Sequence, residues 1–547
     1  MELLVFDVLV IGSGPAGVQA LAALSRERLS LGLIDPGKVE EQYQELIPDE
    51  PFAEIRQNCR HQQRFFLGDQ DEALSPGASR LAAHLTPPRQ FLLEGTARHL
   101  PFRSETLSHF QTLARGGLGA GWGAGACTFS SEELRGVGVN PAGMGSLYSE
   151  VAESIGVSLD PVDDTTQFVC DLAGGQPPLE VDENAEALLA AYRRKSEPLN
   201  ADGFFLGKAP LAVLTRNRQR AGILRRACSY HNMDYYSDHG GAVYRPSHTL
   251  AELQKEPGFE HLQGYLALEL IEKDHLVSVV CRSLAGGETV TFQARKVVLA
   301  AGALNSARLV LASGRKFGRK LPLLSNEVRF LPSLILSRLG RPQGSRKYSL
   351  AQLVGVSSRS NGDSLISYFF SYDSLLFFRL VRDLPLPVWL GHPVARAIVS
   401  SLTIATLHFP DRFTRLKWIR VPEPASGACL PELEAEYRLT FREEDRIKND
   451  TIRLQRHLLR IGCLPLSVIN RGSGTAVHYG GTLPFEENGE PLLTCRPDGR
   501  LNGTHGIYVA DSAPWRFLPA KGLTLSIMAN ARRVAGEVVK DLQSGAF

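Results

Sequence analysis

Cysteine is scarce in this chain. Its 8 cysteines in 547 residues are scattered, with no C-x-x-C pair and none of the dense spacing of a disulfide scaffold. Such cysteine usage fits a reducing compartment. The first residues, Met1–Leu4, also lack the basic stretch of a secretory signal, so we expect a cytoplasmic protein.

An excess of charge of one sign is also missing. The 60 basic and 58 acidic side chains leave a formal net charge of +2. A chain this balanced has no overall field that attracts the phosphate backbone of nucleic acids, and we expect no such partner. No internal repeat or low-complexity tract is evident, and the length is sufficient for several ordinary domains with a large core.

Long apolar runs and clusters of metal ligands are absent as well. The most apolar part, 365–409, is interrupted by arginines and prolines and contains no continuous span of about 20 apolar residues, the length of a transmembrane helix. We expect it to form the core of a substrate domain and the wall of a pocket, with peripheral membrane contact as the alternative. Cys228, His231 and His239 lack a fourth ligand and paired spacing, so no metal is expected.

The clearest motif lies near the N-terminus. Val5–Ile11 is almost entirely apolar, which predicts a buried parallel strand, and it leads into a G-x-G-x-x-G sequence that opens a helix. The first glycine permits a tight turn, the second lets the backbone approach a pyrophosphate, and the third lets the helix pack on the strand. A second strand, Leu31–Ile34, ends in Asp35, whose carboxylate can accept hydrogen bonds from an adenosine ribose. The motif residues predicted to bind a dinucleotide are Gly12, Ser13, Gly14, Pro15, Ala16 and Gly17.

The length of the chain favours FAD over a nicotinamide cofactor, because a compact nicotinamide domain would not need so many residues. Two later segments also favour FAD. The stretch 116–125 has six glycines in ten positions, too many for the interior of a helix or strand. We expect a loop that lays backbone N–H groups along the flavin and its diphosphate, with a flexible linker as the alternative. The stretch 297–310 predicts a strand, a tight turn and a helix that return to the nucleotide sheet. The predicted cofactor contacts here are Arg115, Gly116, Gly117, Leu118, Gly119, Gly121, Trp122, Ala301 and Gly302.

A third segment, near the C-terminus, completes the predicted cofactor site. Gly506–Ser512 predicts a short strand with Asp511 at its carboxyl end, where ligands gather in open α/β sheets; a solvated loop acid is the alternative. Residues from 523 to 534 predict a helix that starts after Gly522. Its N-terminus carries partial positive charge, which would stabilise an anionic reduced flavin. The predicted contacts are Asp511, Ser512, Gly522 and Leu523.

In their order, these blocks resemble the glucose–methanol–choline oxidoreductases, FAD-dependent enzymes that oxidise alcohols. Gly302–Gly314 is similar to the second signature of the family, except that Ala307 stands where proline is usual. In the pyranose-oxidase-like branch, a histidine before the tryptophan of the glycine loop can bond covalently to the flavin. That position here is Gly121, so the resemblance implies non-covalent FAD.

The blocks also predict an α/β fold with two domains. The first is a Rossmann-type FAD-binding domain made of residues 1–130, 220–315 and 475–547. The second is a substrate-binding domain made of residues 131–219 and 316–474, which we expect to be built on an antiparallel sheet.

The predicted chemistry depends on one histidine. The segment Gly474–Thr482 has an H-x-x-G-T spacing that resembles the part of the family carrying the active-site histidine, which makes His478 the catalytic candidate. An imidazole, with an ordinary pKa of about 6.5, can accept the proton of an alcohol hydroxyl, while the flavin performs the redox step. A buried structural histidine is the alternative.

The resemblance also implies a second histidine or asparagine just before the last helix. Gly522 stands at that position, preceded by Lys521, so the usual pair is incomplete. Either His478 acts with electrostatic help from the helix N-terminus and Lys521, or a residue of the substrate domain substitutes. A solvated Lys521 that caps the helix is a further alternative.

The resulting expectation is an FAD-dependent oxidoreductase that converts CH–OH to a carbonyl on a sugar, cyclitol or glycosylated metabolite. It would transfer a hydride to the flavin with His478 as the base, and pass electrons to oxygen or another acceptor. The sugar preference comes only from the likeness to the pyranose-oxidase branch. One alternative is oxidation of a lipid or sterol alcohol, and another is a flavoprotein that isomerises its substrate or senses redox state.

Overall fold

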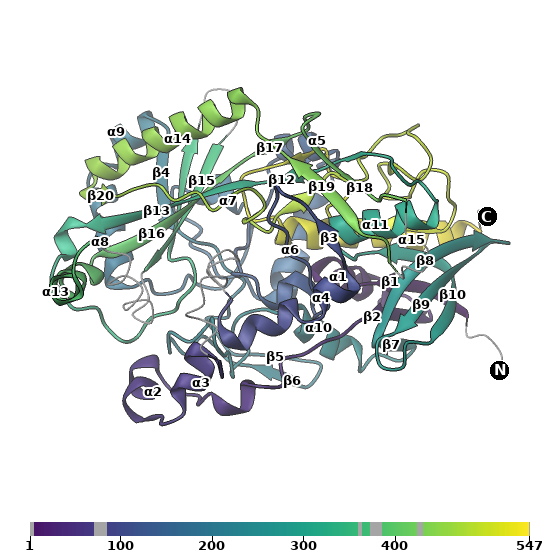
Figure 1. Cartoon of the computed structure of the whole chain (residues 1–547), viewed down its shortest axis with the longest axis horizontal. Coiled ribbons are helices and arrows are strands. Elements are labelled where there is room, and N and C mark those ends of the chain that lie inside the picture. The colour runs from purple at the N-terminus through teal and green to yellow at the C-terminus, as the bar shows by residue number, and fades with distance from the viewer. Residues whose placement is uncertain (1–4, 71–84, 359–363, 372–384, 424–429, 546–547) are drawn as a thin grey trace.

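A computed structural model describes residues 5–70, 85–358, 364–371, 385–423 and 430–545. Two large sheets organise the chain, a mainly parallel one and an antiparallel one, which lie at opposite sides of the view in Figure 1. The predicted α/β fold with a Rossmann-type sheet and an antiparallel substrate sheet is confirmed. The domain boundaries given above stay a prediction.

The parallel sheet has β1 (Val5–Ile11) near its centre, between β2 (Leu31–Asp35) and β10 (Thr289–Leu299). β7 (Phe259–Gln263) extends it beyond β2, and β22 (Ile507–Val509) pairs with the end of β10. The first half of β10 pairs instead with an antiparallel hairpin, β8 (Tyr265–Lys273) and β9 (Leu276–Ser283). The nucleotide sheet therefore collects strands from three distant parts of the chain.

Helices cover both faces of this sheet, which explains why its central strands are apolar throughout. Val8 and Val10 face α1 (Pro15–Leu24), α10 (Pro246–Leu253) and α15 (Thr524–Ser544). Leu9 and Ile11 face the larger core that includes α11 (Ala303–Ser313). Because the side chains of a strand alternate, each face of β1 buries every second residue.

The antiparallel sheet has the order β20-β13-β16-β15-β14-β4. Its strands are β4 (Phe204–Lys208), β13 (Glu327–Ile335), β14 (Leu353–Ser358), β15 (Ser364–Ser371), β16 (Leu402–Phe409) and β20 (Cys463–Pro465). On one face, Leu331, Phe369 and Leu407 pack against α8 (Glu183–Arg193) and α14 (Phe441–Arg460), and α14 runs along the outside of the sheet in Figure 1. The other face is turned inward.

Shorter elements join the two sheets. The remaining helices are α2 (Phe52–Asn58), α3 (Gln62–Leu67), α4 (Thr96–His99), α5 (Ser131–Val137), α6 (Met144–Ile155), α7 (Thr166–Val169), α9 (Ser196–Ala201) and α13 (Val388–Val399). The remaining strands are β3 (Phe102–Arg103), β5 (Arg218–Arg220), β6 (Ile223–Arg225), β11 (Leu321–Pro322), β12 (Leu324–Ser325), β17 (Asp411–Arg412), β18 (Lys417–Arg420), β19 (Leu433–Tyr437), β21 (Tyr479–Gly480) and β23 (Phe517–Leu518). Within the ranges described, no helix is both long and apolar enough to cross a membrane.

Candidate functional site

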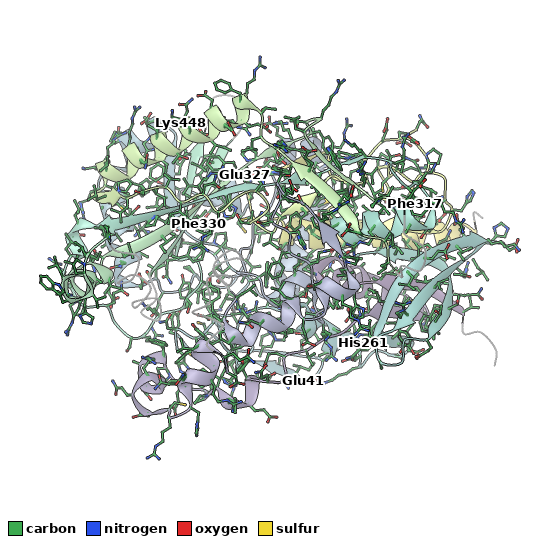
Figure 2. All side chains as sticks on the ribbon, in the orientation of Figure 1. Glu41, His261, Phe317, Glu327, Phe330 and Lys448 are labelled. Atoms are coloured by element: carbon green, nitrogen blue, oxygen red, sulfur yellow. The ribbon has the colours of Figure 1, made fainter. Side chains whose placement is uncertain are left out.

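A cavity of about 440 Å³ lies between the two sheets and is lined by segments from both. From the parallel sheet it receives the ends of β1 and β2 and the turn after β10. From the antiparallel sheet it receives the inward side chains of β13, β15 and β16, among them Phe330, labelled in Figure 2. The cavity therefore joins the predicted dinucleotide elements to the predicted substrate domain.

The three glycines of the first motif have different roles in the structure. A Cβ atom on Gly12, whose φ is +102°, would lie 2.6 Å from the carbonyl oxygen of Ala300, and one on Gly17 would lie 1.8 Å from that of Gly12. Both positions are therefore restricted to glycine by the fold itself. A Cβ on Gly14 would come no closer than 4.0 Å to Ala300 or Gly117, and Gly14 lines the cavity. Gly14 is thus the glycine that leaves room for a ligand.

The second glycine stretch is held against the first. The Ser13 hydroxyl accepts a hydrogen bond of 2.8 Å from the N–H of Gly116, and a Cβ on Gly117 would lie 3.0 Å from Cα of Gly14. The indole N–H of Trp122 donates to the Tyr244 carbonyl at 2.7 Å. Gly123 and Gly125 line the cavity, and a Cβ atom added to either would meet nothing within 4 Å. These contacts rule out a flexible linker and leave open space beside the loop.

Four polar side chains that line the cavity contain buried atoms with no hydrogen-bond partner among the described residues. These atoms are Oδ2 of Asp35, Oδ1 of Asn305, Nε and Nη1 of Arg308, and Nδ1 of His408. Nε2 of His261 on β7, labelled in Figure 2, lies 3.6 Å from Oδ2 of Asp35. Leaving such an atom unpaired costs about 1–3 kcal/mol, so these groups are expected to meet a polar ligand. A carboxylate at the end of β2 that lines the cavity fits the ribose of FAD.

Sequence reasoning missed Asn305 and Arg308 as cavity residues. Both lie on α11, which follows the predicted turn at Gly302. Their spacing of one helical turn places them on one side of the helix, which is the only signal the sequence carries for them. Burial lowers the pKa of Arg308 to about 9, and its Nη2 donates to the Pro101 carbonyl at 2.8 Å.

Asp511 lines the cavity but is not a solvated acid. Its carboxylate accepts hydrogen bonds from the N–H of Gly302 at 2.9 Å, from the N–H of Ala513 at 2.9 Å and from the hydroxyl of Ser306. Burial nevertheless raises its pKa to about 6. These bonds fix the turn after β10, where Gly302 has a φ of +82° and faces open space. The neighbouring Ser512 donates to the Tyr479 carbonyl at 2.6 Å.

His478 lies at the other end of the cavity, beside the antiparallel sheet. Strands β12 and β21 pair so that Ser325 is opposite Tyr479, which brings Asn326 next to His478. Nδ1 of His478 lies 3.1 Å from Oδ1 of Asn326, while Nδ2 of Asn326 donates to the carbonyls of Phe409 at 2.8 Å and Pro519 at 3.1 Å. The amide oxygen must therefore accept from His478, which puts the imidazole proton on Nδ1 and leaves Nε2 unprotonated.

The electrostatics of His478 agree with this tautomer. Burial lowers its pKa to about 4, so the ring is neutral at pH 7. An unprotonated Nε2 in a cavity is able to accept a proton from a bound hydroxyl.

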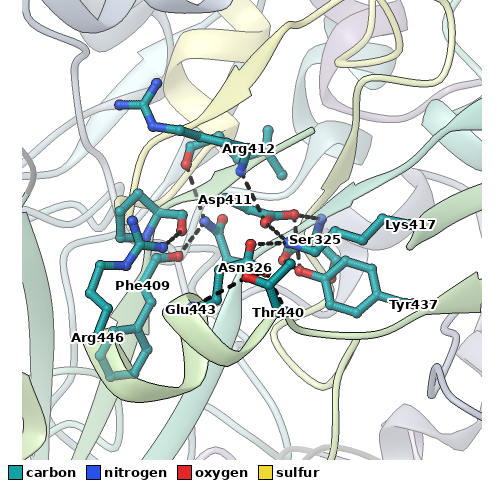
Figure 3. A network of polar contacts seen from close by, with 12 residues as sticks. Ser325, Asn326, Phe409, Asp411, Arg412, Lys417, Tyr437, Thr440, Glu443 and Arg446 are labelled. Atoms are coloured by element: carbon teal, nitrogen blue, oxygen red, sulfur yellow. Dashed lines mark hydrogen bonds and ion pairs between the residues drawn. The ribbon is translucent and has the colours of Figure 1, made fainter. Parts of the chain in front are cut away.

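A buried network supports Asn326 (Figure 3). The Asp411 carboxylate accepts hydrogen bonds from the N–H of Ser325 at 2.8 Å and the hydroxyl of Tyr437 at 2.9 Å. Lys417, whose side chain is fully buried, forms ion pairs with both Asp411 and Glu443. The network fixes the backbone of Ser325, directly before Asn326, and thereby helps to orient Asn326 and His478.

Replacing Lys417 by methionine should lower the free energy of unfolding by about 3–5 kcal/mol, because the change leaves buried carboxylates without their cation. Urea unfolding followed by circular dichroism measures the loss. Lys540→Met, which breaks an exposed pair with Glu537, is the matched control and should change stability by less than about 1 kcal/mol. Equal stability of the two variants would contradict the structural role given to the network.

The inward face of the antiparallel sheet forms the wall opposite the nucleotide elements. Its cavity-lining residues are Val328, Phe330, Tyr368, Phe370, Thr406 and His408. The rings of His408 and His478 have centroids 5.7 Å apart and are tilted by 33°. Sequence reasoning did not name His408, although it left open that the substrate domain supplies a residue. The alternation of β16, which places positions 406 and 408 on one face, was the available signal.

The structure does not bring Lys521 into the cavity. Its ammonium donates to Glu133 at 2.6 Å and to the Thr128 carbonyl at 3.2 Å, and its side chain is only 5% exposed. Lys521 thus does not line the cavity and is not a solvated cap, because Glu133 of α5 supplies its partner. Gly522 and Leu523, by contrast, line the cavity at the start of α15.

Three other predicted contacts lie just outside the cavity lining: Gly17, Arg115 and Gly116. Arg115 donates to the Gln263 side chain at 2.6 Å instead of facing the glycine motif. Within the apolar stretch 365–409, β15 and β16 form cavity wall, whereas Trp389 on α13 is 77% exposed. Residues 372–384 of that stretch lie outside the described residues. Across those described, no three histidine, cysteine or acidic side chains gather as a metal site requires.

Comparisons with known proteins agree with this architecture, although no family model matches the chain. A C-glycoside 3-oxidase from Microbacterium trichothecenolyticum is 25% identical over 568 aligned residues, which cover 98% of each chain. A second C-glycoside 3-oxidase, from Arthrobacter globiformis, is 23% identical over 54% of this chain and 56% of its own.

Two solved structures share the fold over nearly the whole length. Pyridoxine 4-oxidase from Mesorbium loti has a TM-score of 0.57 at 14% identity and covers 97% of this chain and 98% of its own. A formate oxidase from Aspergillus oryzae, a variant studied for modification of its FAD, has a TM-score of 0.59 at 12% identity, with 99% and 100% covered.

Proposed function

Because the chain belongs to the glucose–methanol–choline oxidoreductases and is an FAD-dependent alcohol oxidoreductase, we propose that it oxidises a ring hydroxyl of a sugar or glycosylated metabolite. The product is the corresponding carbonyl compound. The observation that carries the proposal is the neutral His478, with an unprotonated Nε2, in the cavity that also contains the dinucleotide elements. The two relatives named as glycoside oxidases support a sugar substrate over a sterol or lipid alcohol.

The chain's part in the reaction is to hold the hydroxyl and take its proton. A hydroxyl is too weak an acid to ionise unaided at neutral pH, and Nε2 of His478 accepts the proton as the carbonyl forms. Asn326 keeps the acceptor nitrogen turned toward the cavity by occupying Nδ1. FAD, when bound, supplies the acceptor for the hydride that leaves the carbon bearing the hydroxyl. The electrons would go to oxygen or another acceptor, and the names of the relatives favour oxygen.

The residues that would hold FAD are those of the cavity lining. Gly14 and the 116–125 loop leave room for the diphosphate, Asp35 fits the ribose, and the start of α15 presents free N–H groups toward the flavin. We also propose the individual roles of these residues, the transfer of a hydride and a cytoplasmic location.

FAD should be released by acid precipitation, because no side chain at Gly121 is available to bond to the flavin. A Cβ there would already lie 2.4 Å from Cδ1 of Leu92. We expect a yellow supernatant, whose pigment chromatography identifies as FAD, and a colourless precipitate of apoprotein. Colour that stays with the precipitate would contradict non-covalent binding.

The first test is anaerobic absorbance of the purified holoenzyme while sugars, aryl glycosides, cyclitols, sterols and long-chain alcohols are added one at a time. Bleaching of the oxidised flavin band by a sugar or glycoside supports the proposal. Bleaching only by sterols or long-chain alcohols would overturn the substrate class. If nothing bleaches the flavin, alcohol oxidation itself would be contradicted in favour of a non-redox or sensing role.

A further inference from the structure

The position just before the last helix has no side chain in this protein, and another group takes up the space. The N–H of Gly522 donates to the hydroxyl of Tyr368 at 3.1 Å, and Sγ of Cys127 lies 3.2 Å from the same hydroxyl. A Cβ on Gly522 would lie 3.2 Å from the Gly125 carbonyl. Tyr368 belongs to β15 of the antiparallel sheet. A side chain of this sheet therefore lies beside Gly522, where the last helix has no side chain of its own.

His408 stands beside Tyr368 on the neighbouring strand. The two rings contact edge to face at 5.3 Å between centroids, and His408 faces His478 on its other side at 5.7 Å. Two imidazoles whose ring centres are this close can both hydrogen-bond one oxygen atom that lies between them.

The hydrogen bonds of His408 leave one nitrogen for a ligand. Nε2 lies 3.2 Å from the hydroxyl of Thr406. In the tautomer in which this hydroxyl donates to Nε2, the ring proton resides on Nδ1. Nδ1 is buried with no hydrogen-bond partner in the described part of the chain. Burial and the nearby His478 lower the pKa of His408 to about 3, so it is a neutral donor at pH 7.

We propose that His408 is the second catalytic residue of the site and replaces the side chain missing at Gly522. Its Nδ1–H donates a hydrogen bond to the substrate oxygen whose proton passes to Nε2 of His478. That oxygen becomes the carbonyl oxygen, and no proton leaves His408. The inference depends on the proposed function, because it assigns a role in that same oxidation.

Two substitutions test the inference. His408→Leu removes the donor and should slow anaerobic flavin reduction at saturating substrate by about a hundredfold or more, as loss of one hydrogen-bond donor to a developing charge does. His408→Asn keeps an amide N–H near the place of Nδ1 and should recover part of that loss. Both variants should bind FAD as the wild type does.

A structural histidine provides the matched control. His457 on α14 stacks on Phe204 and lies 2.9 Å from Asp202, outside the cavity. His457→Gln should lower thermal stability without slowing flavin reduction. Wild-type reduction by His408→Leu, or equal losses in the Leu and Asn variants, would overturn the role of His408 alone. A wild-type enzyme that no hydroxyl compound reduces would overturn the proposed function and this inference with it.

Discussion

Replacing His478 by alanine is expected to slow anaerobic reduction of the bound flavin by at least about a hundredfold, the usual contribution of a general base. The FAD content should not change, because His478 lies at the substrate end of the cavity and Asp35 and Gly14 at the other. Stopped-flow absorbance at saturating substrate measures the rate directly. A variant that is reduced at the wild-type rate would remove His478 from the mechanism.

The pH dependence of the wild type gives an independent check on the same residue. His478 accepts a proton only when it is neutral, and its pKa lies near 4. The rate of flavin reduction should therefore be flat from neutral pH down to about pH 5 and fall as the pH approaches 4. Asn326→Leu, which removes the acceptor for Nδ1–H, should lower the plateau, because the tautomer and the ring orientation are no longer fixed.

Replacing Gly14 by valine is expected to give a folded protein with almost no FAD. The φ of Gly14 is −63°, which valine adopts without strain, and a Cβ there has no neighbour closer than 4.0 Å. The branched side chain would instead fill the space that the backbone leaves for the diphosphate. The ratio of flavin to protein absorbance, together with titration of the apoprotein with FAD, measures the effect.

Two other glycines make the Gly14 experiment specific. Gly536 lies on α15 outside the cavity lining, and a Cβ atom there would meet nothing within 4 Å. Gly536→Ala should therefore retain full FAD content. Gly17→Val would clash with the Gly12 carbonyl and should fail to fold. Full FAD content in the Gly14→Val protein would refute the placement of the cofactor.

The parts of the site that were predictable from sequence are those with local signals. An apolar strand, a glycine turn and a helix follow one another within 5–24, and the last helix was expected to start after Gly522 and begins at Thr524. Turn geometry and burial on both faces leave a direct mark on the residue types of such segments. Asp511 was located in the same way, at the end of its strand.

The parts that were not predictable depend on long-range pairing. Lys521 contacts Glu133, which lies 388 residues away in the sequence. The residues around a lysine at the start of a helix carry no signal for such a distant partner. His408 and His478 meet only because β13 pairs with β16 while the segment after β12 lies beside β21. The register between distant strands, and not the local pattern, decides which polar side chains share the cavity.

The alternation of the antiparallel sheet separates two tasks that single residues perform together in many active sites. On β13, β15 and β16, the side chains of Leu331, Phe369 and Leu407 pack under α8 and α14, while Phe330, Phe370 and Thr406 line the cavity on the other face. Phe330 and Phe370, which are only partly buried, are therefore the wall positions where a different substrate can be fitted with the least disturbance of the core. The fold offers this wall as a surface on which selection, or an engineer, can change specificity without rebuilding the core.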